Sequence, residues 1–146
     1  MEKRHSGSTD RRKQQKLDRL RGDLRAPRRP LTDFESLYEV ANDGALFSVR
    51  LQRFLKPVIN PEHGNAELEF EHQDVRQRIS PGKAVALSFF LPAKRARIAD
   101  EAYEEQSFHD YDGLKGHPAI ARLAYKYDVL EGAIFYILMS SLSERH

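Results

Sequence analysis

Apolar residues are nearly absent from the first thirty positions of this 146-residue chain. Residues 1–30 contain only Met1, Leu17, Leu20 and Leu24 as sizeable apolar side chains. A segment with so little surface to bury cannot offset the entropy lost on ordering, so we expect residues 1–30 to be disordered in isolation. The hydrophobic core must then come from residues 31–146, which suffice for one domain with a single core.

The same thirty residues hold most of the positive charge. They carry 11 Lys or Arg against 4 Asp or Glu, a net formal charge of +7, whereas residues 31–146 have a net charge of −5. We call residues 1–30 the basic arm. Because each cation that neutralises a phosphate releases counterions, such an arm can bind a polyanion. The arm cations that we expect to contact DNA or RNA are Arg11, Arg12, Lys13, Lys16, Arg19, Arg21, Arg25, Arg28 and Arg29.

Two other interpretations of the basic arm remain open at this point. The arm could bind an acidic protein surface, or it could be a passive tail that keeps the protein in solution. The chain has no cysteine, which excludes disulfides and thiolate sites and fits a reducing compartment. No apolar run approaches the ~18 residues of a membrane span, and residues 1–12 lack the apolar core of a secretion signal. We expect a cytoplasmic protein that does not bind membranes.

Local patterns in the first half of residues 31–146 predict one helix and two strands. Thr32 and Glu35 match a capping box, which predicts a short helix over residues 33–42. Apolar and polar residues alternate over residues 47–51 and again over residues 66–71, as in half-buried strands. We expect these two strands to be neighbours, with Arg50 opposite a row of glutamates at positions 67, 69 and 71.

Residues 84–91, which are apolar nearly throughout, predict a central strand covered on both faces. Residues 93–106 predict a helix, and residues 107–118 predict a loop. Pro118 then opens the strongest helical pattern of the chain. The expected fold is therefore α+β, with a small, mostly antiparallel sheet, a short N-terminal helix and a long C-terminal helix, preceded by the disordered arm.

Apolar residues in this last segment recur at spacings of three and four, as in a heptad seam. The seam can be a partner interface, which would favour a homo-oligomer or a larger complex, or it can pack on the sheet of its own chain. The residues that an interface would use are Ile120, Leu123, Tyr127, Leu130, Ile134, Phe135, Ile137 and Leu138.

A second basic cluster lies at the start of the helix predicted over residues 93–106. Lys94, Arg95 and Arg97 occupy the end where the helix dipole disfavours cations. A bound phosphate would compensate for this arrangement, so the three residues join the candidate nucleic-acid-binding set. The alternative is a solvated helix held by packing and by pairs such as Arg97 with Glu101.

The sequence contains no motif for catalysis or metal binding. His109, Asp110, Asp112 and His117 resemble metal ligands by type, but their spacing matches no calcium loop and no helical ligand pair. Nucleophile-elbow and phosphate-loop patterns are absent. We expect no cofactor, no metal and no enzymatic activity. The predicted function is a non-catalytic accessory or regulatory protein that binds DNA or RNA through the basic arm, and the alternative is an assembly subunit or adaptor that docks through its apolar C-terminal helix.

Overall fold

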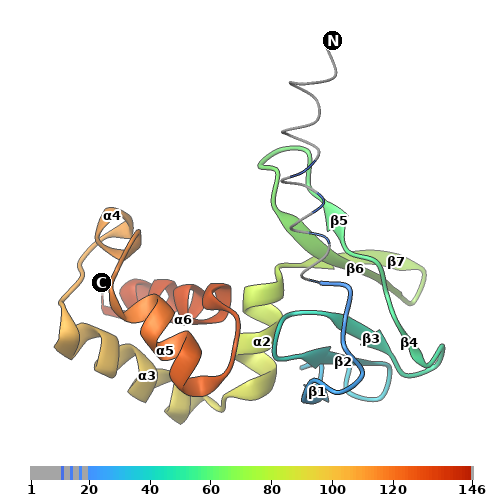
Figure 1. Ribbon diagram of the computed structural model, residues 1–146, viewed down its shortest axis with the longest axis horizontal. Coiled ribbons are helices and arrows are strands. Elements are labelled where there is room, and N and C mark those ends of the chain that lie inside the picture. The colour runs from blue at the N-terminus through green and yellow to red at the C-terminus, as the bar shows by residue number, and fades with distance from the viewer. Residues whose placement is uncertain (1–10, 12–13, 15–16, 18–19, 146) are drawn as a thin grey trace, which may run out of the picture.

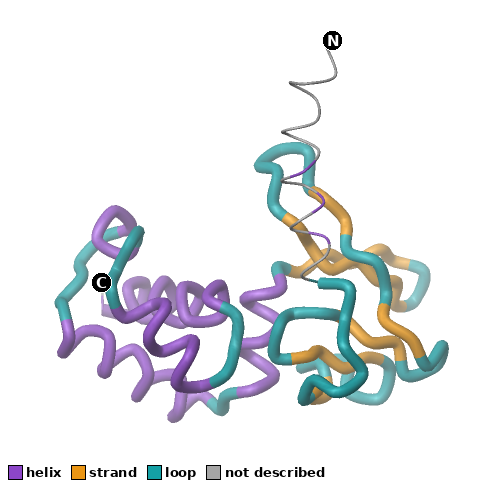
Figure 2. The backbone as a smooth tube through the Cα atoms, viewed as in Figure 1, coloured by secondary structure: helices purple, strands orange, loops and turns teal. Residues whose placement is uncertain are grey.

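The computed structural model describes Arg11, Gln14, Leu17 and residues 20–145. It confirms the α+β class: two small antiparallel sheets lie on one side and most of the helices lie on the other (Figure 1). Figure 2 shows the strands gathered in one part of the molecule, with a single helix, α2 (Pro81–Phe89), leading from them to the helical part. The disorder predicted for residues 1–10, 12–13, 15–16 and 18–19 stays a prediction, because these positions lie outside the described residues.

The first sheet has the strand order β1-β2-β3-β4, and all its pairs are antiparallel. Its strands are β1 (Arg28–Pro30), β2 (Tyr38–Ala41), β3 (Leu46–Ser48) and β4 (Arg53–Phe54). Val40 of β2 pairs with Leu46 of β3, and both side chains are buried on the face next to α2. The opposite face carries Phe47 and Phe54, whose ring centroids are 5.2 Å apart.

The second sheet contains β5 (Val58–Ile59), β6 (Ala66–His72) and β7 (Val75–Ile79). The alternation predicted over residues 66–71 is confirmed, because Leu68 and Phe70 are buried while the glutamates between them line the other face. On that face the Nε of Arg78 lies 2.8 Å from the carboxylate of Glu69. The Tyr38 ring of β2 lies 4.9 Å from the Phe70 ring of β6, and this contact links the two sheets.

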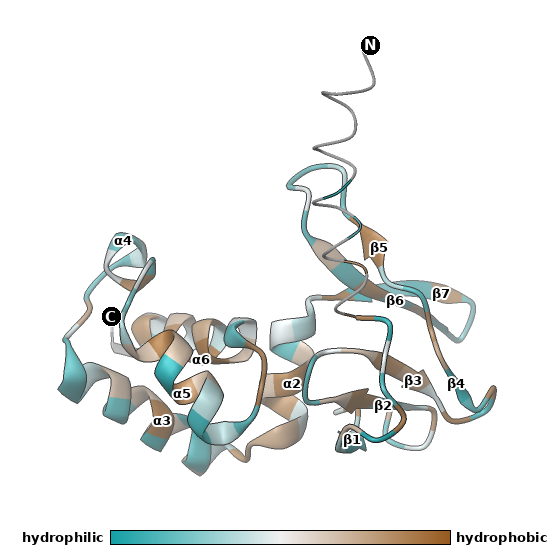
Figure 3. Ribbon diagram, in the orientation of Figure 1, coloured by the Kyte–Doolittle hydropathy of each residue, from teal (hydrophilic) through white to brown (hydrophobic). Residues whose placement is uncertain are grey.

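The remaining helices form the second half of the core. They are α3 (Pro92–Glu105), α4 (Tyr111–Leu114), α5 (Ala119–Tyr127) and α6 (Glu131–Arg145). Val85, Ile98, Leu123, Ile134 and Leu138 are almost completely buried between these helices and α2. Figure 3 shows apolar residues along α6 and hydrophilic residues on the outer side of α3. A helix with the length and hydropathy of a membrane span does not occur in the described part of the chain.

The helix predicted over residues 33–42 is wrong. Residues 38–41 form strand β2, and Asp33 has φ of 75°. Between them lies only a single turn, in which the N–H groups of Leu37 and Tyr38 bond to the carbonyl of Phe34. The hydroxyl of Thr32 does not cap a helix but donates to the carbonyl of Leu87 in α2, at 3.0 Å. Glu35 accepts from the N–H of Asp33 at 2.9 Å. A tertiary bond of Thr32 and a local bond of Glu35 therefore use the two side chains on which the capping box depended.

The strand predicted over residues 84–91 is also wrong, because this segment lies mainly in α2. Ser80 accepts a hydrogen bond from the N–H of Lys83 at 3.2 Å, and Pro81 occupies the first helical position. Ala84, Val85 and Ala86 are fully buried, so α2 is apolar on nearly every side. A short segment buried all round has the same composition as a central strand, and only the flanking residues distinguish the two.

The predicted pairing between residues 47–51 and residues 66–71 is wrong as well. Strand β3 belongs to the first sheet and β6 to the second, while Arg50 lies in the turn after β3. The row of glutamates instead faces Arg76 and Arg78 of β7, whose Nε atoms lie 3.8 Å and 2.8 Å from Glu69. The expected charge pairing exists, but its cations come from the neighbouring hairpin strand.

The helix predicted over residues 93–106 is confirmed as α3, and the long C-terminal helix is confirmed as α6, which begins at Glu131 rather than near Pro118. Asp128, with φ of 56°, ends α5 in the left-handed region. Its carbonyl accepts from the side-chain amide of Asn42 at 2.9 Å, and the N–H of Leu130 bonds to the carbonyl of Asn42. These contacts to the first sheet fix the break, and the loop of residues 107–118 contains the short α4.

Candidate nucleic-acid interface

The base of the basic arm, residues 20–30, is part of the folded domain. Leu20 is only 4% exposed, and Arg28–Pro30 form the edge strand β1. Gly22, with φ of +95°, lies so close to the Phe54 ring that a Cβ at this position would be 2.2 Å from it. Gly22 therefore packs on the sheet face that carries Phe54, whereas Leu20 lies with Pro81 of α2 beside Gly44, and the ordered fold begins before residue 31.

Arg28 has a structural role. Its Nε lies 3.0 Å from the Glu39 carboxylate, and its guanidinium lies 4.1 Å from the centroid of the Phe47 ring. The side chain is 25% exposed. A partly buried ion pair stacked on an aromatic ring holds the guanidinium in place. The phosphate contact predicted for Arg28 stays a prediction, and a phosphate would have to compete with this ion pair for the guanidinium.

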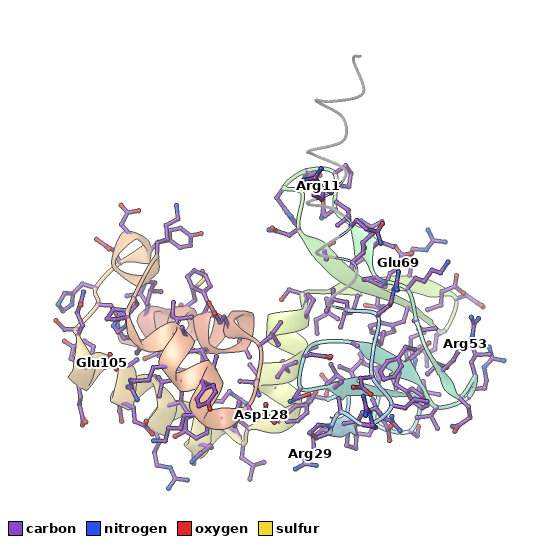
Figure 4. The ribbon with its side chains drawn as sticks, viewed as in Figure 1. Arg11, Arg29, Arg53, Glu69, Glu105 and Asp128 are labelled. Carbon is purple, nitrogen blue, oxygen red and sulfur yellow. The ribbon has the colours of Figure 1, made fainter. Side chains whose placement is uncertain are left out.

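Other arm cations face solvent. Arg29 is exposed, with its guanidinium 5.5 Å from the Phe89 ring, and Arg25 is exposed with only a local contact to Asp23, at 3.4 Å. Arg11 and Arg21 are exposed too. Figure 4 shows Arg11 and Arg29 at opposite ends of the strand-containing part. The remaining predicted arm residues, Arg12, Lys13, Lys16 and Arg19, lie outside the described residues.

Three exposed cations of the first sheet were missed by the sequence prediction. Arg50, Arg53 and Lys56 follow β3 at spacings of three, and none forms an ion pair with any described residue. Figure 4 shows Arg53 at the outer edge of the sheet. The signal was present in the sequence, but the expected pairing of Arg50 with the glutamate row concealed it. These residues extend the solvent-facing positive charge beyond the arm.

The second basic cluster does not converge on one point. Arg95 donates to the carbonyl of Phe90 at 2.5 Å, and the Nζ of Lys94 lies 4.8 Å from the centroid of the Tyr127 ring. Arg97 is exposed, and the predicted pair of Arg97 with Glu101 is not among the ion pairs of the described residues. Two of the three cations thus stabilise the packing of α3 on its neighbours, and Arg97 alone projects into solvent.

Glu101 instead joins α3 to α5. Its carboxylate accepts from the Tyr127 hydroxyl at 2.5 Å and from the Nζ of Lys126 at 2.9 Å. The hydrogen bond from Tyr127 is the largest cause that lowers the pKa of Glu101, and the bond from Lys126 is the second. Burial and the same carboxylate raise the pKa of Tyr127, and Glu101 raises the pKa of Lys126. The three groups therefore stabilise one another's neutral-pH protonation states.

This network predicts a pH-dependent contribution to stability. Replacing Glu101 with Gln is expected to lower the free energy of unfolding by ~1 kcal/mol at neutral pH. Because the pKa of Glu101 lies below its ordinary 4.5 in the folded state, the contribution is complete above that value and is lost as the pH falls through the folded-state pKa. Urea titrations of both proteins at neutral and acidic pH measure it.

Glu104→Gln is the matched control, because Glu104 is exposed on the same helix and forms no ion pair with any described residue. We expect this variant to unfold like the wild type at every pH. A Glu101→Gln effect that stays constant from neutral pH to pH values well below 4.5 would contradict the assigned role of the carboxylate.

The candidate interface residues of the C-terminal segment divide into two groups. Leu123, Ile134, Ile137 and Leu138 are buried in the core of their own chain, which favours the intramolecular interpretation for these four. Ile120, Tyr127, Leu130 and Phe135 are partly buried against that core. Two exposed apolar side chains next to them, Tyr125 and Met139, were not in the predicted set.

Of the four residues that resemble metal ligands, Asp110 and His117 have structural roles. Asp110 caps α4 by accepting from the N–H of Gly113 at 2.8 Å. His117 is buried; its Nδ1 accepts from the N–H of Ala119, and its Nε2 donates to the carbonyl of Gln106. The part of the chain that the structure describes contains no group of three or more His, Asp or Glu side chains placed to bind a metal ion.

No protein-family model, no curated protein and no solved structure matches this chain.

Proposed function

We propose that the protein is a non-catalytic, nucleic-acid-associated accessory or regulatory protein whose basic arm contacts DNA or RNA phosphates in the cytoplasm. The observation that carries the proposal is the net charge of +7 over residues 1–30. The exposed guanidinium groups of Arg25 and Arg29 support it, because they remain accessible where the arm is packed on the sheet.

The exposed cations after β3 support a wider contact surface. Arg50, Arg53 and Lys56 face solvent on the same sheet that holds the base of the arm. Phosphate contacts of this kind position a protein on nucleic acid without reading its sequence. The proposed binding is therefore strongly salt-dependent and has little sequence preference.

The test is a fluorescence-polarisation titration of the full chain with labelled duplex DNA and with single-stranded RNA, each at two salt concentrations. In the arm variant, Arg11, Arg12, Lys13, Lys16 and Arg19 are replaced by Gln. Deleting residues 1–30 would remove Leu20 from the core and β1 from the sheet, whereas these substitutions spare both. We expect binding to weaken by more than about tenfold at low salt, and the salt slope to fall by about one unit for each phosphate that the arm no longer neutralises.

The control variant replaces Lys83 and Lys115, two exposed cations outside the proposed contact surface, with Gln. A two-residue arm variant, in which only Arg11 and Arg12 become Gln, matches its change in net charge. The two-residue arm variant is expected to lose considerably more affinity than this control. Equal losses would show that affinity follows net charge rather than the arm, and undiminished binding by the arm variant would refute the proposal.

A second candidate function is that of an assembly subunit or adaptor, and the exposed Met139 and partly buried Phe135 of α6 favour it. The residues that face solvent on α6, rather than the buried part of the predicted seam, would then make the contact. Light scattering of the purified protein distinguishes a homo-oligomer from a monomer that awaits another partner.

A further inference from the structure

A wide groove lies between the sheets and the last two helices. Its volume is about 1520 Å³. Leu20, Asn65 and Ala66 line one side, and residues of α5, α6 and the loop between them line the other. The N-terminal residues of α2 lie at its base, where α2 crosses α6. Figure 1 shows α2 between the two parts of the molecule that border the groove.

The helical side of the groove presents apolar and aromatic side chains to solvent. Tyr125 of α5 is 91% exposed and Met139 of α6 is 40% exposed. Phe135 and Tyr136 lie beside Met139 on α6 and are partly buried. Aromatic residues and methionine are enriched at protein interfaces: the rigid rings bury much area at little entropic cost, and methionine adapts its shape to a partner. This wall is therefore suited to receiving apolar side chains.

Among the described residues that line the groove, every charged one is acidic: Asp43, Asp128 and Glu131. Asp43 is partly engaged, because its carboxylate accepts from the N–H of Ala45 at 3.1 Å. Asp128 and Glu131 are exposed, and neither forms an ion pair with a described residue. A cationic ligand would therefore meet two exposed carboxylates without an ion-pair partner among the described residues. Glu131 lies in the first turn of α6, where the helix dipole offsets part of its charge.

Asp128 is the strongest cation-binding position in the groove. It ends α5, where the helix dipole adds partial negative charge to that of the carboxylate. The basic residue in the last turn of α5, Lys126, is bonded to Glu101 and does not line the groove. Tyr125 offers an exposed ring in the same part of α5 for a cation–π contact. Figure 4 shows Asp128 between the helical and the strand-containing parts.

We propose that this groove binds a basic, amphipathic segment of a partner protein. Apolar side chains of the segment pack on Phe135 and Met139, and its Lys or Arg side chains pair with Asp128 and Glu131. This proposal is independent of nucleic-acid binding by the arm. An acidic groove repels phosphates, so nucleic acid would not occupy it. The arm and the groove would then serve two partners of opposite charge.

The test uses the full chain and two labelled peptides of about four helical turns. One peptide has Leu at positions i, i+3, i+4 and i+7 with Lys elsewhere, and the other has Glu in place of Lys. We expect saturable binding of the Lys peptide, measured by fluorescence polarisation, and no binding of the Glu peptide. Met139→Lys is expected to weaken binding about tenfold, and Asp128→Asn about threefold at low salt and less at high salt.

Each variant has a matched control outside the groove. Leu91→Lys places the same cation at an apolar position that is 78% exposed, and Asp112→Asn removes an exposed carboxylate from α4. Asparagine tolerates the left-handed backbone of residue 128, so Asp128→Asn keeps the fold. Control variants that weaken binding by no more than about twofold support the proposal.

Three results would overturn the proposal: no saturable binding of the Lys peptide, equal binding of the two peptides, or equal losses in groove and control variants. A wild-type dimer that Met139→Lys converts to a monomer would assign the groove to a second copy of the chain, and would also overturn the partner-segment proposal.

Discussion

Replacing Gly82 with Ala is expected to destabilise the protein by ~4 kcal/mol, the largest effect that we predict for a single methyl group. Helices α2 and α6 cross at this residue. A Cβ on Gly82 would lie 2.4 Å from the carbonyl oxygen and 2.5 Å from the carbonyl carbon of Gly132. Backbone atoms of α6 cannot rotate away as a side chain can, so the two helices must separate.

Separation of α2 from α6 would open gaps beside Val85 and Ile134, which are fully buried. The weaker dispersion attraction and the strain would add to each other. Urea or thermal unfolding followed by circular dichroism measures the effect, and a loss of this size corresponds to a fall in Tm of about 10 °C for a domain of this length.

Gly132→Ala provides the matched comparison on the other helix. Its Cβ would lie 3.5 Å from the Cα of Gly82, which is an ordinary contact. Because alanine also has the higher helix propensity, we expect a change within about 1 kcal/mol in either direction. Similar destabilisation by the two substitutions would show that the helices do not cross as closely as described.

The second large effect is expected at Gly22, where alanine should cost ~3 kcal/mol. The backbone there has φ of +95°, and a Cβ would lie 2.2 Å from the Phe54 ring. Either the ring moves away from Arg28 and Phe47 or the base of the arm lifts from the sheet. Hydrogen exchange should then show faster opening of β4, and trypsin should cleave faster at Arg21 and Arg25.

Gly64→Ala separates the two causes of that destabilisation. Gly64 has a comparable φ of +72°, but no atom lies within 4 Å of its Cβ position. This variant therefore measures the backbone strain alone, about 1 kcal/mol. If Gly22→Ala and Gly64→Ala destabilise the protein equally, then residues 20–26 are not packed on the sheet, and the base of the arm belongs to the disordered segment predicted from the sequence.

The position of the arm also decides which of its cations can act. Composition identified the net charge of residues 1–30 but could not show that Arg28 is paired with Glu39 and stacked on Phe47. Those contacts join Arg28 to Glu39 and Phe47, which lie 11 and 19 positions further along the chain. Arg28 and Arg29 are adjacent and share the same local sequence pattern, yet the charge of Arg29 faces solvent.

Local signals predicted the elements that local interactions dominate. The alternation over residues 66–71 and the long helix at the C-terminal end follow from periodicity, which a single segment carries within itself. The helix over residues 93–106 follows from its mixture of alanine and charged residues. The α+β class follows from the same patterns, because strands precede helices along the chain.

Tertiary structure alone decided the rest. Residues 84–91 are apolar enough for either a central strand or a buried helix. In the folded protein they lie mainly in α2, which contacts α6 through Gly82. Thr32 and Glu35 could cap a helix, yet the Thr32 hydroxyl bonds to Leu87, more than fifty residues away. In each case the sequence determined a set of feasible local conformations, and burial against distant segments selected one, because non-local packing and hydrogen bonds outweigh the small differences in intrinsic propensity.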